Sequence, residues 1–321
     1  MRARHLFLTL LTLLWPSVTT TAQEATGPSG THAEEQIEFS VAVDAVYLNA
    51  VVTAGRRMIP GLKAEDFEIR ENGVPQELSF FASGNTPVTV ILLLDASSSI
   101  QPNANGVKSA AINFVHQLRP GDRAMIGFFN QDLFFPTDFT GDVSALERAI
   151  DGFRPGGATA LYDAVRVSLD KLSAVNGRTA LLVLTDGTDS WPSADGSDIT
   201  QDQAVERGKL SDVSIYTVGF EGRLGLGSGV RGINRHFLGN LANETGGRAF
   251  YPHDLGQLSY NFSQIMEELH SQYRIAYVPK DATRDGSWRR LRVRIKDYDH
   301  LDVRTRQGYY AVQKTAPTTE P

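Results

Sequence analysis

Cysteine is absent from all 321 residues of the sequence. Its absence excludes disulfide bonds, zinc sites with thiolate ligands, a catalytic thiol and a lipid-modified N-terminal cysteine. A disulfide-rich extracellular module is therefore excluded. Stability has to come from a hydrophobic core, for which 41% hydrophobic residues are sufficient.

Positive charge is not in excess either, because 31 Lys and Arg residues against 37 Asp and Glu residues give a net charge of -6. The sequence gives no reason to expect nucleic acid as a partner, which would call for a basic patch. It has no Gly-x-Ser-x-Gly elbow and no His-Glu-x-x-His spacing, and this argues against a serine hydrolase and a zinc protease. Beyond the N-terminus no apolar run reaches the roughly 18 residues of a membrane span, so we expect no transmembrane helix in the mature chain.

The N-terminus has the features of a secretory signal peptide. Arg2 and Arg4 precede an apolar stretch at residues 6–15, and Thr20-Thr21-Ala22 supplies small residues before a cleavage point. The alternative is an uncleaved N-terminal anchor. An exported protein without disulfides fits a bacterial periplasmic or secreted location.

The hydrophobic pattern changes twice along the chain. Residues 88–94, 179–185 and 213–218 are apolar runs typical of strands buried on both faces of a parallel sheet, and amphipathic helical segments alternate with them. This order predicts an α/β fold with a doubly wound, mostly parallel sheet. The predicted divisions are a signal peptide (1–22), a linker (23–35), a first β segment (36–86), an α/β segment (87–270), a second β segment (271–313) and a disordered tail (314–321).

Both flanks of the α/β segment read as β-structure. In the second flank Leu291, Val293 and Ile295 alternate with Arg292, Arg294 and Lys296. We expect the two flanks to form one β-sandwich-like domain into which the α/β domain is inserted; two separate β extensions are the alternative. We interpret Arg292, Arg294 and Lys296, the basic row, as the solvated face of a strand and not as a ligand patch. Its charges would also protect a sheet edge from pairing with another chain.

A hairpin is predicted in the first flank. Glu71-Asn72-Gly73 is a turn signal between the runs at residues 67–69 and 78–81.

Oxygen-bearing side chains gather where the predicted parallel strands end. Asp95 comes directly after the run at residues 88–94, and Ser97 and Ser99 follow it at alternate positions. Asp186 comes directly after the run at residues 179–185. Thr159 lies in the turn Gly156-Gly157-Ala158-Thr159. Ligands of open α/β sheets bind at the carboxyl ends of the strands. We therefore expect these side chains to share one cavity, although an ordinary turn could also account for the two serines.

The chemistry of this set suits a divalent metal ion. Carboxylate and hydroxyl oxygens are hard ligands that favour Mg²⁺, with Mn²⁺ or Ca²⁺ as alternatives, over zinc or copper. Asp95 and Asp186 only just neutralise a divalent cation. The ion would keep its attraction for an anionic group, and we expect a protein partner to supply an Asp or Glu carboxylate.

The three motif segments, in this order, resemble the metal-ion-dependent adhesion site of von Willebrand factor A domains. The resemblance covers about residues 87–270 and rests on Asp95-x-Ser97-x-Ser99, the Thr159 turn and Leu184-Thr185-Asp186-Gly187. It implies metal-mediated protein binding or adhesion without catalysis. Residues 158–163 differ from the Thr-x-Thr-Gly of animal members, so only Thr159 is carried over.

The flanks resemble exported, Acidobacteria-type VWFA-related proteins of bacteria. The phrase that carries this resemblance is Gly61-Leu62, Asp66-Phe67, Ile69 and Glu71-Asn72-Gly73, with Gly308-Tyr309-Tyr310 near the end.

Two other functional classes compete with metal-dependent binding. One is a scaffold subunit of an envelope complex that binds without metal, and the other is a metal-assisted hydrolase, which needs a general base beside the ion. Two further carboxylates are given structural roles. Asp163 is expected to stabilise the N-terminus of a helix, with metal binding as the alternative. Asp189 is expected to be solvated, and a hydrogen bond near the site is the alternative.

Overall fold

The computed structural model describes residues 45–84, 86–185, 189–220, 233–298 and 300–312. Asp186 and the segments predicted as signal peptide, linker and disordered tail lie outside the described residues. Residues from Val43 onward belong to one compact unit.

The central sheet confirms the predicted α/β class. Within the described residues its strand order is β11-β10-β9-β6-β7-β8. The first five of these strands are parallel to their neighbours, and β8 is antiparallel to β7. Their bounds are β6 Val88–Asp95, β7 Arg123–Phe129, β8 Leu133–Phe134, β9 Arg178–Thr185, β10 Ser214–Gly219 and β11 Ala249–Phe250.

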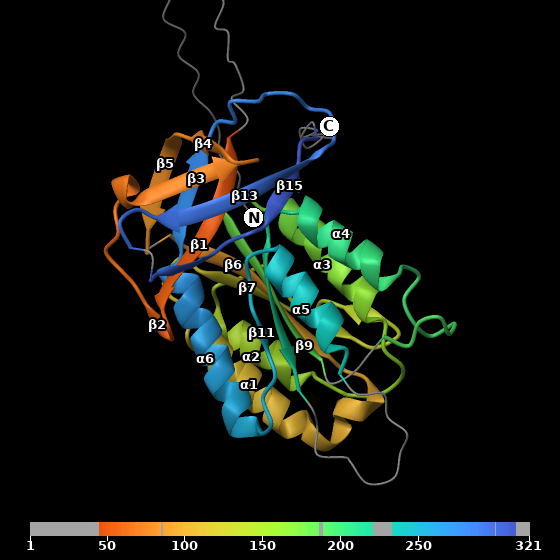
Figure 1. The fold of residues 1–321 in the computed structure, drawn as a ribbon. Coiled ribbons are helices and arrows are strands. Elements are labelled where there is room, and N and C mark those ends of the chain that lie inside the picture. Colours follow the sequence, from red (N-terminus) through yellow and green to blue (C-terminus); the bar gives the residue numbers. More distant parts are fainter. Residues whose placement is uncertain (1–44, 85, 186–188, 221–232, 299, 313–321) are drawn as a thin grey trace, which may run out of the picture. The chain divides into compact units, whose positions relative to one another are not determined.

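Helices cover both faces of this sheet (Figure 1). The reason is visible in β6, where Leu92 and Leu94 join a core cluster with α1, α2 and α6, while Ile91 and Leu93 join another with α3, α4 and α5. Alternate residues of a strand point to opposite faces, so an uninterrupted apolar run needs cover on both sides. The helices are α1 Ala104–Val115, α2 Val143–Asp151, α3 Leu161–Ser173, α4 Gln201–Leu210, α5 Arg235–Glu244 and α6 Leu255–Ser271, with short 3-10 turns η1 Ala64–Asp66 and η2 Ser98–Asn103.

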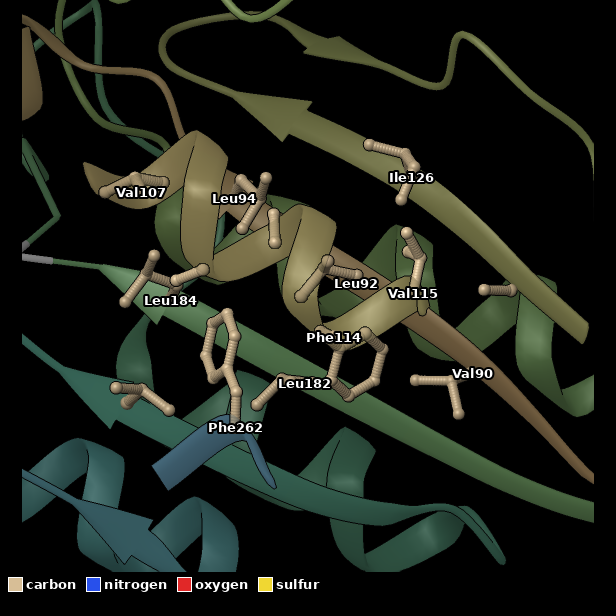
Figure 2. Close-up of a cluster of buried hydrophobic side chains, with 14 of the residues drawn as sticks. Val90, Leu92, Leu94, Val107, Phe114, Val115, Ile126, Leu182, Leu184 and Phe262 are labelled. Carbon is tan, nitrogen blue, oxygen red and sulfur yellow. The ribbon is translucent and has the colours of Figure 1, made fainter. Parts of the chain in front are cut away.

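Figure 2 shows the core beneath α1. Phe114 of α1 meets Phe262 of α6 edge-on, with ring centroids 5.8 Å apart, above Leu92 and Leu182 of the sheet. Fully burying each side chain of this size contributes about 1.5–3 kcal/mol. This packing fixes the strand ends from which the candidate site is built.

The flanking segments form two further sheets. One has the order β14-β1-β12-β5, with β2 on β1, and the other has the order β15-β13-β3-β4. Strands from the two ends of the chain pair in both, β1 with β12 and β3 with β13. Their bounds are β1 Val46–Ala54, β2 Arg57–Met58, β3 Phe67–Glu71, β4 Val74–Gln76, β5 Leu78–Ser83, β12 Tyr273–Tyr277, β13 Trp288–Ile295, β14 Asp302–Arg304 and β15 Gly308–Tyr310.

The two flanking sheets share one buried cluster, which includes Leu48, Phe67 and Tyr273. A buried carboxylate lies within it: Glu71 accepts hydrogen bonds from the hydroxyls of Tyr277 (2.6 Å) and Tyr309 (2.8 Å). Burial and the bond to Glu71 raise the pKa of Tyr309 to about 12. Both phenols therefore stay protonated and keep donating.

Two details of the flanks differ from expectation. Asn72 and Gly73 form the predicted turn, with φ of 47° and 86°, but they join β3 to β4. The run at residues 78–81 belongs to β5 and pairs with β12 in the other sheet, because the chain changes sheets after β4. Arg292, Arg294 and Lys296 are exposed, as predicted for the basic row. Their strand, however, lies between β15 and β3 and guards no edge.

The chain enters and leaves the α/β part at neighbouring positions. Ser83 at the end of β5 pairs with Tyr273 at the start of β12. Polar contacts reinforce this junction: the buried guanidinium of Arg178 donates to the carbonyl of Thr86 (2.7 Å) and to Gln272 Oε1 (3.1 Å).

Candidate metal centre

Asp95 is the last residue of β6 and its side chain is completely buried. One carboxylate oxygen accepts a hydrogen bond from the Ser97 amide (2.8 Å), and the other accepts one from the Thr185 hydroxyl (2.6 Å). A buried carboxylate is costly unless it is paired, hydrogen-bonded or bound to a metal. The two donors fix its orientation at the carboxyl end of the sheet.

Ser97 and Ser99 begin the turn that follows. Ser97 is buried, Ser99 is exposed, and their hydroxyl oxygens are 3.0 Å apart. Ser97 precedes η2, yet its side chain makes no capping hydrogen bond, so an ordinary capping role does not account for it. The separation matches adjacent ligands of an octahedral ion with bonds of about 2.1 Å, which are about 3.0 Å apart.

Hydrogen bonds bring the Thr159 segment to this turn. The Gly156 amide donates to the carbonyl of Ala96 (2.7 Å), and the Ser98 amide donates to the carbonyl of Gly157 (3.1 Å). Gly157 has a φ of +86°, and a Cβ there would lie 1.8 Å from Gln131 Oε1. The positive φ favours glycine here, and any Cβ would also displace the end of the Gln131 side chain.

Thr159 itself is buried and is held by Ser190. Its amide donates to the Ser190 hydroxyl (3.1 Å), and its carbonyl accepts from the Ser190 amide (2.8 Å). The structure thus joins the Asp95, Thr159 and Ser190 segments into one rim of loops at the carboxyl end of the sheet.

Several residues that organise this rim were missed by the sequence analysis. After β7, Asn130 donates through Nδ2 to the carbonyl of Gly156 (2.7 Å) and accepts at its own carbonyl from Ala160 (2.7 Å). Thr185 holds Asp95 and directly precedes Asp186. The available signal was position, because both residues stand at the carboxyl end of a parallel strand.

Asp189 was expected to be solvated, and this was wrong. The side chain is 3% exposed. It accepts from the amides of Trp191 (2.7 Å), Ser197 (3.0 Å) and Tyr162 (2.9 Å) and from the Ser197 hydroxyl (2.5 Å). The first amides of α3 lack helical partners; that of Tyr162 binds this carboxylate, and that of Asp163 donates to the Ser197 hydroxyl (3.0 Å). Asp163 lies in the first turn of α3, as predicted.

The donors at the rim are mainly hydroxyls. In the part of the chain that the structure describes, no group of three or more His, Asp or Glu side chains is placed to hold a metal. A metal held here would rely on the carboxylate of Asp95 and the hydroxyls of Ser97, Ser99 and Thr159. Asp186, the other expected ligand, lies outside the described residues. None of the helices in the described ranges is both long and apolar enough to cross a membrane.

The family model for the von Willebrand factor type A domain matches residues 89–265, more than half of the chain. The chain belongs to the von Willebrand factor type A (VWA) family. The match spans the strands whose ends carry Asp95 and Thr185.

Solved structures resemble the VWA chain at low identity. A von Willebrand factor type A protein from Catenulispora acidiphila is 12% identical, with 85% of this chain and 75% of that chain covered and a TM-score of 0.50. An aerotolerance-related membrane protein from Bacteroides fragilis is 18% identical (56% and 99% covered, TM-score 0.46). The von Willebrand factor domain of the pili tip protein Mfa5 from Porphyromonas gingivalis is 15% identical (58% and 95% covered, TM-score 0.45). No curated protein sequence matches significantly.

Proposed function

We propose that this VWA protein is an exported binding or adhesion module that engages a protein partner through a divalent cation. The observation that carries the proposal is the hydroxyl pair of Ser97 and Ser99, 3.0 Å apart beside the buried carboxylate of Asp95. Family membership supports the same function.

The residues present fit a metal ion. Asp95, Ser97, Ser99 and Thr159 would bind it directly, and Asp186 would bind directly or through water. The small set of hard oxygen ligands suits Mg²⁺, which keeps several waters, with Mn²⁺ or Ca²⁺ as alternatives. When bound, the cation supplies Lewis acidity and an exchangeable position for an anionic oxygen.

The charge balance favours an acidic partner. Asp95 and Asp186 together neutralise a divalent cation without leaving excess negative charge. A carboxylate from an Asp or Glu of the partner would then be attracted to the ion. Additional protein carboxylates would repel it, since like charges in close contact are unfavourable.

Binding is favoured over catalysis by the composition of the motif turns. Residues 95–99, 156–159 and 184–187 contain no His or Glu that could serve as a general base. A metal-assisted hydrolase therefore remains the weaker alternative, and turnover of generic ester or phosphate substrates would revive it.

We also propose that the two flanks constitute one β-sandwich-like domain interrupted by the VWA domain, in a protein released by signal-peptide cleavage. The pairing of β1 with β12 and of β3 with β13, together with the shared core, supports a single interrupted domain. The resemblance of the flanks to exported bacterial VWFA-related proteins supports a periplasmic or secreted location.

Calorimetric titration with MgCl₂ tests the site directly. We expect the purified protein to bind one Mg²⁺ and the Asp95→Ala variant to bind at least tenfold more weakly. Thr185→Val should weaken binding less, because it removes only the hydroxyl that orients Asp95. Asp151→Ala, which alters an exposed carboxylate at the end of α2, is the matched control and should bind normally.

Partner capture from the native host, with and without EDTA, tests the function. The expected result is a protein retained by wild type only when metal is present, and lost with Asp95→Ala. Equal capture by both proteins in EDTA would instead establish the metal-independent scaffold and contradict the proposal.

A further inference from the structure

A row of cations lies on the outer face of the sheet formed by β15, β13, β3 and β4. Along β13 the outward positions are Arg290, Arg292, Arg294 and Lys296, all exposed, while the intervening residues are buried. Arg70 of β3 lies directly opposite Arg292. We call this set the basic face; it stands out on a chain whose net charge is -6.

The basic face is only partly neutralised by its neighbours. Glu68 holds two of its members, with one carboxylate oxygen 2.6 Å from Arg70 Nε and the other 2.5 Å from Arg294 Nε. The guanidiniums of Arg290 and Arg292 form no hydrogen bond or ion pair with any other described residue. Positive charge is therefore left over at the Arg290 and Arg292 end of the row.

The arrangement has a cost for the free protein. Like charges at directly opposed positions of an antiparallel pair are destabilising, and Arg292 faces Arg70. An anionic occupant would relieve that repulsion. Glu68 offsets part of this repulsion by pairing with Arg70, but Arg292 has no such acidic neighbour in the described part of the chain.

The surface around this row is concave. One hollow is lined by Arg70, Asn72, Trp288, Arg290, Arg292 and Arg294. A second is lined by Lys209, Glu244, Gln307 and Tyr310 and shares Trp288, Arg290 and Arg292 with the first. The two hollows therefore adjoin along β13, and the depression continues from the β3–β4 hairpin to the ends of α4 and α5. A hollow admits an extended chain better than it meets a flat membrane.

We propose that the basic face binds an extended acidic segment of a partner protein, with Asp or Glu at alternate positions. Outward side chains of a strand repeat about every 6.8 Å, and an extended peptide has the same repeat, so successive carboxylates would meet successive cations. Guanidinium groups bind carboxylates bidentately, which adds orientation to the charge attraction.

The aromatic group at the end of the row argues against single-stranded nucleic acid. Sequence-tolerant binding of bases uses free aromatic faces. The Trp288 ring is already engaged by Tyr310, edge-on at 4.9 Å, and by Lys209, whose ammonium is 5.5 Å from the ring centroid. It serves as a wall of the hollow.

The test uses two fluorescein-labelled octapeptides of equal composition, one alternating Glu and Ser and the other with four Glu followed by four Ser. Fluorescence anisotropy is measured with the full-length protein at low salt in EDTA, so that the candidate metal centre cannot contribute. We expect the alternating peptide to bind at least fivefold tighter than the block peptide. Binding should weaken as salt rises and should persist in Asp95→Ala.

Charge reversal locates the binding. The double variant Arg290→Glu and Arg292→Glu should bind the alternating peptide at least tenfold more weakly than wild type does. Arg56→Glu with Arg57→Glu changes the net charge equally at exposed positions around β2 and should leave affinity unchanged. Absence of binding, equal affinity for the two peptides, or equal loss in the control variant would overturn the proposal. So would tighter, Arg290-dependent binding of single-stranded DNA, heparin or anionic vesicles.

Discussion

At the residue scale, Asp122 and His270 form a buried pair between the turn before β7 and the end of α6. Asp122 Oδ2 lies 2.7 Å from His270 Nε2, and both side chains are nearly inaccessible. The amides of Val88 and Arg119 also donate to this carboxylate. The carboxylate therefore joins the start of β6 to the last turn of the final helix.

This pair gives the fold a defined acid sensitivity. Burial alone would raise the pKa of Asp122, but the bonds from His270, Val88 and Arg119 together hold it below its usual value. The ionised carboxylate thus stabilises the folded state above the unfolded pKa of about 3.9, and this stabilisation is lost as pH falls through the lower folded pKa.

We expect Asp122→Asn to lower the free energy of unfolding by about 1–3 kcal/mol at pH 7, because buried donors lose a charged acceptor. The difference from wild type should shrink as the pH falls below about 4. Urea denaturation at pH 7, 5 and 3 measures it, with Asp151→Asn as an exposed control. A difference that stays constant down to pH 3 would contradict this assignment.

The site residues differ in how far the sequence revealed them. Asp95, Ser97 and Ser99 are recognisable because their spacing is local and their strand is a continuous apolar run. The role of Asn130 depends on a carbonyl 26 positions away, and that of Thr185 on a carboxylate 90 positions away. Only the packing of separate loops creates such contacts, so spacing alone could not predict them.

At the element scale, two glycines end elements for different physical reasons. Gly73, with a φ of +86°, closes the β3–β4 turn, and a Cβ there would meet nothing within 4 Å. Gly247, after α5, lies so close to β10 that a Cβ would be 1.8 Å from the carbonyl oxygen of Ile215. The first is required by backbone conformation and the second by space.

Alanine substitutions should separate these two causes. Gly73→Ala is expected to cost about 1–2 kcal/mol, the penalty of a left-handed conformation for an L-residue. Gly247→Ala should cost about 3 kcal/mol or more, since backbone must move to remove the clash. Urea unfolding of both variants provides the comparison, and a Gly73 variant that is the less stable of the two would refute the explanation.

Among the elements, the buried strands were the most predictable. The run in β9 (Arg178–Thr185) is apolar throughout its centre, and no other element of that length suits it. The partner of β3 was misassigned because β4 is only three residues long and contains Pro75, which gives little strand signal. Which sheet a short strand joins is decided by tertiary packing.

At the scale of the whole molecule, Glu268 connects α6 to two other segments. Its side chain is 5% exposed; one oxygen lies 3.2 Å from Arg248 Nη1, and the other pairs with Arg304 of β14. Arg304 also donates to the carbonyl of Gly246 (3.0 Å). One carboxylate thus ties the final helix of the VWA part to a strand of the β flank.

We expect Glu268→Ala to reduce the free energy of unfolding by about 1–3 kcal/mol, because the partly buried guanidinium of Arg304 would lose its charged hydrogen-bond acceptor. The adjacent Glu267→Ala removes an exposed carboxylate from the same helix and should change stability by less than about 0.5 kcal/mol. Scanning calorimetry compares the two variants with wild type. Equal melting temperatures for both variants would show that the connection is not a source of stability.

The pairing of Ser83 with Tyr273 has a mechanical consequence. A partner that pulls on the loops at the carboxyl ends of the central strands applies tension at the opposite end of those strands from this pair. That tension reaches the β flank through two covalent connections that run side by side, so each bears only part of the load. Because Ser83 and Tyr273 are drawn in the same direction, the hydrogen bonds between β5 and β12 are not opened one after another from this end.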